Sequence, residues 1–165
     1  MSQVHDFRAR VEAARQLYAG MPRRGRGELG PADDKTGERW DRANVLGHVA
    51  EILPFWTTQA RAVLAGAEEV GRDEEGYAKR REGIESGDRL TEEQMQAQIG
   101  AGIVALDALL GVLDDLDLDR PAMWRSKTGD RQMDLRMVLD ELLVGHLELH
   151  ARQLAELEPA PEAAP

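Results

Sequence analysis

The chain of 165 residues contains no cysteine, which excludes disulfide bonds, thiolate metal ligands and a cysteine nucleophile together. Aromatic residues make up only 4% of it, so aliphatic side chains and methionine must fill the core. Long apolar runs are also missing. The longest, over residues 101–113, is interrupted by Asp107 and is too short to span a bilayer. Residues 1–16 have no apolar stretch typical of a secretory signal. We therefore expect a cytoplasmic protein that does not enter a membrane.

Basic residues are few relative to acidic ones, and the net charge is -10. Such a protein repels phosphate backbones, so we expect no nucleic-acid partner. Apolar residues at 42% and charged residues at 32% are typical of a globular protein. The length indicates one domain over residues 1–157, followed by a flexible Pro/Ala-rich tail over residues 158–165.

Helical periodicity occurs in four segments, which cover residues 2–19, 41–66, 91–116 and 134–157. The last three begin with the N-cap residues Asp41, Thr91 and Asp134. Each cap follows a large apolar residue and has another apolar residue four positions later, which is the pattern of a hydrophobic staple. No segment longer than a few residues has the period of a strand. The sequence therefore predicts an all-α four-helix bundle.

The connections between these helices predict their directions. Residues 67–90 form a charged connection of about 24 residues, longer than an antiparallel helix pair needs. A crossover between two parallel helices explains this length, so we expect an up-down-down-up order. The arginines of this crossover could bind the carboxylates of a cofactor, or could simply be solvated. A second connection contains Thr128, Gly129 and Asp130, which favour a short hairpin.

Three of the four histidines lie on apolar helix faces. His48 is in the middle of an apolar stripe in the second helix, and His146 and His150 are one turn apart in the fourth. The stripe predicted for the fourth helix contains Leu135, Val138, Leu139, Leu142, His146, Leu149, His150 and Gln153. The remaining histidine, His5, is near a helix end and is expected to be ordinary.

The depth of each histidine in its helix can be compared. His48 is roughly 10 Å into the second helix, and His150 and His146 are about 10 to 16 Å from the far end of the fourth. The up-down-down-up order makes these two helices antiparallel. In that arrangement the three rings lie at the same level of the bundle. A lone buried histidine is usually a hydrogen-bonded core residue. Three buried histidines in one core need more hydrogen-bond partners than the surrounding apolar residues can supply. We therefore predict a metal site formed by His48, His146 and His150.

Three imidazoles suit zinc, nickel, iron(II) or cobalt(II), and they leave one coordination position open, as in catalytic sites. Glu51 follows His48 by one turn and could be a general base, an acceptor behind the ligands or a rim carboxylate. Gln153 follows His150 by three residues and could orient its ring or a bound water. Pro54 should kink the second helix.

Two motifs carry a resemblance to a known family. The segments WDRANVLGH at 40–48 and DLRMVLDELLVGHLELHARQL at 134–154 resemble the DinB-like superfamily, the DinB/YfiT-like metalloenzymes. The resemblance implies a four-helix bundle with up-down-down-up order, a three-histidine metal site and a homodimer. That superfamily includes S-transferases that use mycothiol, bacillithiol or glutathione.

We therefore expect a thiol-dependent S-transferase that acts on small electrophiles. Its cofactors would be a divalent metal, zinc or nickel by preference, and a low-molecular-weight thiol such as mycothiol. The lack of cysteine fits this hypothesis, because the nucleophilic sulfur must then come from outside the chain. Two alternatives stay open: a hydrolase that uses a metal-bound water with Glu51 as base, and a non-catalytic metal-binding stress protein.

Overall fold

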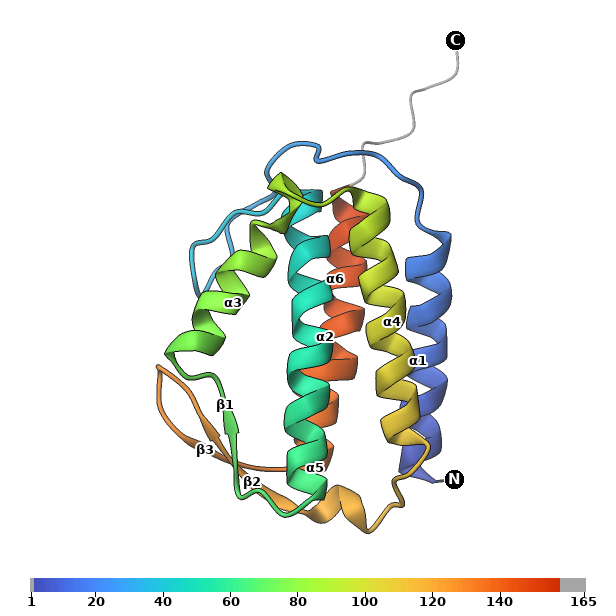
Figure 1. Ribbon diagram of the computed structural model, residues 1–165, viewed down its shortest axis with the longest axis vertical. Coiled ribbons are helices and arrows are strands. Elements are labelled where there is room, and N and C mark those ends of the chain that lie inside the picture. The colour runs from blue at the N-terminus through green and yellow to red at the C-terminus, as the bar shows by residue number, and fades with distance from the viewer. Residues whose placement is uncertain (1, 158–165) are drawn as a thin grey trace.

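Four long helices lie side by side in the computed structural model, which describes residues 2–157 (Figure 1). They are α1 (Gln3–Gly20), α2 (Arg42–Leu64), α4 (Glu92–Leu110) and α6 (Gly145–Glu156). In Figure 1, α1 and α6 run upward and α2 and α4 run downward, which agrees with the predicted order. None of the helices in the described part of the chain is long and apolar enough to cross a membrane. The tail predicted over residues 158–165 lies outside the described residues.

The predicted helix starts are confirmed by their capping contacts. The Asp41 carboxylate accepts from the backbone N–H of Asn44, whose side chain accepts from the Asp41 backbone in return. Thr91 and Gln94 form the same reciprocal capping box at α4. Because these contacts satisfy N–H groups that have no partner within the helix, they fix where each helix begins.

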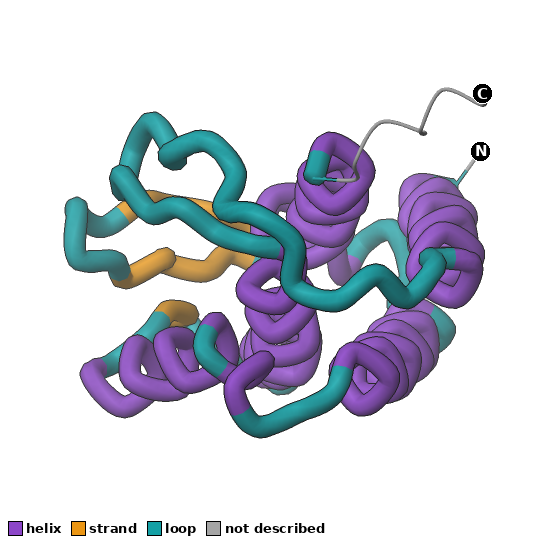
Figure 2. Tube along the Cα trace, turned by 90° about the horizontal axis from the view of Figure 1, so that it is seen from above, coloured by secondary structure: helices purple, strands orange, loops and turns teal. Residues whose placement is uncertain are grey.

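A small sheet corrects the all-α prediction. Its strands are β1 (Glu69–Gly71), β2 (Pro121–Arg125) and β3 (Arg131–Asp134), in the order β1-β2-β3. β1 pairs with β2 in parallel, and β2 and β3 form the antiparallel hairpin predicted around Gly129. A short 3₁₀ turn, η2 (Asp117–Asp119), precedes β2. Seen from above, the sheet lies beside the helices rather than among them (Figure 2). Strands of three to five residues are too short to show a period in the sequence.

The charged crossover also contains a helix that its composition did not predict. This helix, α3 (Glu74–Ile84), is followed by the 3₁₀ turn η1 (Ser86–Asp88). Its one buried residue is Gly76, so it has no apolar stripe. α3 approaches α2 closely where two glycines meet: a Cβ on Gly47 would lie 2.1 Å from the carbonyl oxygen of Gly83. This contact holds the crossover against the helix that carries His48.

The fourth predicted helix is interrupted, which corrects the continuous helix expected over residues 134–157. It begins as α5 (Leu135–Met137), widens into the π-helical segment η3 (Val138–Val144), and continues as α6. Leu149, predicted to face the core, is 50% exposed, while Leu147 and Ala151 are buried instead. A π-helical turn has more residues than an α-helical turn, so the faces of the helix shift after it.

Candidate metal centre

Three histidine rings meet between two helices: that of His48 from α2 and those of His146 and His150 from α6. The ring centroid of His48 lies 5.5 Å from that of His146 and 4.9 Å from that of His150. The centroids of His146 and His150 are 4.8 Å apart. One nitrogen from each ring lies within 4.8 Å of the other two. The predicted convergence is confirmed, and the arrangement could hold a metal ion.

Two nitrogens of this cluster lack the partners that a buried imidazole requires. Nδ1 of His48 and Nε2 of His150 are buried, and neither has a hydrogen-bond partner in the described part of the chain. Leaving a buried polar atom unpaired costs about 1 to 3 kcal/mol. A metal ion between the rings would satisfy such lone pairs, so the donor set fits a metal.

Gln153 fixes which nitrogen of His150 carries the proton. Its Oε1 lies 2.8 Å from Nδ1 of His150, and an amide oxygen can only accept a hydrogen bond. Nδ1 therefore donates, and the buried Nε2 keeps its lone pair for a metal ion. The predicted contact between these residues is present, and the part of Gln153 in catalysis stays a prediction.

The histidines are held in their neutral form. Burial lowers the pKa of His48 well below its ordinary value, and the neighbouring histidines, Arg80 and Arg72 lower it further. Burial likewise lowers the pKa of His146 to about 3 and lowers that of His150, partly offset by the hydrogen bond with Gln153. Neutral imidazole is the form that binds a metal, so no histidine proton has to leave at neutral pH.

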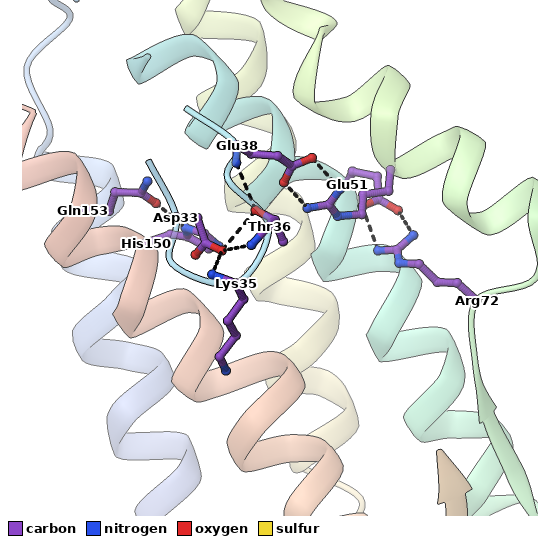
Figure 3. A network of polar contacts seen from close by, with 9 residues as sticks. Asp33, Lys35, Thr36, Glu38, Glu51, Arg72, His150 and Gln153 are labelled. Atoms are coloured by element: carbon purple, nitrogen blue, oxygen red, sulfur yellow. Dashed lines mark hydrogen bonds and ion pairs between the residues drawn. The ribbon is translucent and has the colours of Figure 1, made fainter. Parts of the chain in front are cut away.

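An aromatic ring packs against the cluster. The Trp40 ring centroid lies 4.8 Å from that of His48 and 5.8 Å from that of His150. The Arg80 guanidinium lies 5.7 Å from the centre of the Trp40 ring and pairs with Glu38 at 2.9 Å. Figure 3 shows the loop that carries Glu38, where Asp33 accepts three hydrogen bonds from Lys35 and Thr36. These three hydrogen bonds fix the turn within the loop.

Glu51 is held in a part-buried ion pair. Its two carboxylate oxygens accept hydrogen bonds from the Arg72 guanidinium at 2.6 and 2.9 Å. The Arg72 side chain is 6% exposed and that of Glu51 is 13% exposed (Figure 3). The guanidinium also lies 3.9 Å from the centre of the Phe55 ring. The predicted role of Glu51 as a base is untested, and its carboxylate is engaged in this ion pair.

A groove of about 510 Å³ lies between α2 and α3, and no histidine lines it. Glu51 and Phe55 are among the lining residues, so the groove begins one helical turn from His48. The groove is lined by Glu51, Pro54, Phe55, Thr58, Gln59, Lys79, Glu82, Gly83, Ser86 and Arg89.

Three residues near the histidines did not stand out from the sequence. Trp40 is the large apolar residue before the Asp41 cap, and this position indicates a helix start rather than its contact with His48. Arg72 and Arg80 belong to the charged crossover, where their partners could not be predicted. Pairing each of them with Glu51 or Glu38 required the tertiary structure.

Comparisons with protein-family models, with curated proteins and with solved structures find no match for the chain. The resemblance to the DinB-like superfamily therefore stays a prediction carried by two sequence motifs. The metal centre stands on its own geometry.

Proposed function

We propose that the chain is a metal-dependent enzyme with a three-histidine centre, and that it transfers a small thiol onto an electrophile. One observation carries the proposal: three neutral imidazoles converge with their nitrogens within 4.8 Å, and among residues 2–157 this group includes no carboxylate. Three protein ligands leave a coordination position open, which is the pattern of catalytic sites.

The chain supplies no sulfur nucleophile of its own, because it has no cysteine. A metal ion bound by the histidines would hold an external thiol in its thiolate form at neutral pH. Arg72 and Arg80 lie close enough to the centre to lower the pKa of His48 through their positive charge, and they are paired with Glu51 and Glu38 respectively.

The hydrolase alternative is less well supported by the surroundings of the centre. It requires a base, and the nearest candidate from the sequence, Glu51, accepts hydrogen bonds from Arg72 with both carboxylate oxygens. A carboxylate held in this way must break an ion pair before it takes a proton. The thiol-dependent reaction needs no such base, because coordination already ionises the thiol.

The finer details rest on the resemblance to the DinB-like superfamily. It supports mycothiol or a related thiol as the cofactor and a homodimer, while the three imidazole donors favour zinc or nickel as the metal. Val104 within α4 and Val112 just after it are 58% and 68% exposed, so each could contact a second copy. Light scattering at micromolar concentration tests the dimer.

Thiol binding can be tested with the cobalt(II)-substituted protein. Adding the correct thiol should produce a sulfur-to-metal charge-transfer band, and the affinity should rise with pH until the thiol is fully ionised. His48→Ala should abolish the band, while His5→Ala, at an exposed position, should leave it unchanged. The proposal would be contradicted by a protein that binds cobalt, develops no such band with any thiol, and catalyses a hydrolysis that thiols inhibit.

A further inference from the structure

The π-helical segment η3 decides which face of α6 meets the core. In a regular helix, the stripe of Leu135, Val138, Leu139 and Leu142 would continue through His146, Leu149, His150 and Gln153. The buried residues of α6 are instead Leu147, His150, Ala151 and Leu154. The stripe has moved by one residue, which is a rotation of about 100°.

This rotation moves His146 toward the edge of the packed face, while His150 stays buried. Leu147 is fully buried, whereas His146 is half-buried beside it. The two rings reach His48 and the Trp40 side chain, as the short centroid distances show. The wide turn therefore sets the direction in which the two ligands face.

Gly145 closes the wide turn, and its lack of a side chain is required there. Its N–H donates to the carbonyl of Asp140, five residues earlier. A Cβ at this position would lie 2.3 Å from that carbonyl oxygen, closer than real Cβ contacts allow. The clashing atom belongs to the backbone, so a larger residue at 145 cannot be accommodated by a side-chain rotation.

Arg10 of α1 links η3 to α6 through hydrogen bonds. Its guanidinium donates to Asp140 of η3 at 2.7 Å, and to both carboxylate oxygens of Glu148 of α6 at 2.8 Å. One side chain therefore spans the junction between the π-helical segment and α6. The Tyr18 hydroxyl, also from α1, donates to the carbonyl of Leu147 at 2.9 Å. These contacts hold the turn before His146 in one register.

We propose that Gly145 and Arg10 are positioning residues of the metal centre, which maintain the π-helical register that turns His146 and His150 toward His48. Neither residue contacts the histidine nitrogens. Their effect is transmitted through the backbone of the helix that carries two of the three ligands. This inference rests on the proposed metal centre, and it identifies the residues that orient the ligands of that centre.

The test compares Gly145→Ala with Gly100→Ala, an exposed position on α4 where a Cβ meets nothing within 4 Å. Metal affinity is measured by competition with a chromogenic chelator, and the coordination geometry by the cobalt(II) absorption spectrum. Gly145→Ala should lower the affinity at least tenfold and alter the spectrum. Gly100→Ala should match the wild type in both, and Arg10→Gln should show a smaller loss of affinity.

Deletion of Glu141, an exposed residue of η3, provides a rescue. Removing the extra residue lets the Gly145 N–H bond Asp140 in an ordinary i→i−4 turn, while residues 146–156 keep their orientation. The deletion should preserve metal binding, and Gly145→Ala added to it should fold and bind as the deletion alone does. If Gly145→Ala alone does not fold, the double variant is compared with the deletion variant instead.

Two results would overturn the inference. If Gly145→Ala folds and binds metal within twofold of the wild type, the glycine does not position the ligands. If the deletion does not relieve the effect of Gly145→Ala, register is not the cause. A wild-type chain that binds no metal refutes the proposed centre as well, which separates the two failures.

Discussion

Acid should destabilise the metal-free protein strongly through its buried histidines. His146 has an ordinary pKa of 6.5 in the unfolded chain and about 3 in the folded one, because burial disfavours its charged form. Above pH 6.5 the His146 ring is neutral in both states. Between pH 6.5 and the folded pKa, the unfolded chain binds a proton that the folded chain does not, so the free energy of unfolding falls as the pH falls. Between pH 6.5 and 4.5 the loss is at most about 2.7 kcal/mol for this side chain, from about 1.36 kcal/mol per pH unit.

The assay is urea unfolding in the presence of a chelator at pH 7.0, 5.5 and 4.5. Carboxylates with lowered pKa values, such as that of Glu148, also titrate toward acid pH, so the comparison is made between variants. His146→Gln removes the histidine's contribution and should have a shallower pH dependence than the wild type. His5→Gln, at an exposed position, is the control. Identical pH dependence in wild type and His146→Gln would refute the reasoning.

Three further predictions test the centre and its surroundings. His150→Ala should remove the metal in elemental analysis and lower the melting temperature of the metal-loaded protein, since binding to the folded state adds stability; unchanged metal content would contradict the three-histidine site. Gln153→Leu should weaken metal affinity by about 10 to 100-fold, because Nδ1 of His150 loses its acceptor; calorimetry measures this, and no change would show that the hydrogen bond does not orient the ring. Arg72→Met should lower the free energy of unfolding by about 1 to 3 kcal/mol by leaving the part-buried Glu51 carboxylate without its partner. Glu51→Met added to it should recover most of that loss in urea unfolding, and equal losses in the single and double variants would exclude the unpaired charge as the cause.

The helix starts and the three metal ligands could be predicted because they depend on local chemistry. Asp41 and Thr91 cap their helices through groups only three residues away. The spacing of His146 and His150 places both on neighbouring turns in any helical register. His48 joined them because the antiparallel order of α2 and α6 followed from the length of the crossover.

The rest depended on contacts between residues far apart in the chain. α3 has no apolar stripe, so the sequence does not predict it. Its position depends on the close approach of Gly83 to Gly47 of α2. The strands are too short to have a period, and β1 is stabilised by pairing with β2 some 50 residues later. The ion pair of Glu51 with Arg72 likewise joins two elements whose relative position the sequence does not state.

The sequence by itself determined which side chains form the centre, because histidine spacing and helix capping act over a few residues. The tertiary structure decided which way the fourth helix turns. A regular period placed Leu149 in the core, but the packed helix exposes it, because the π-helical turn closed by Gly145 shifts the face by one residue. That turn is fastened by Arg10 from α1, 130 residues from Asp140, and such a contact exists only once the chain has folded.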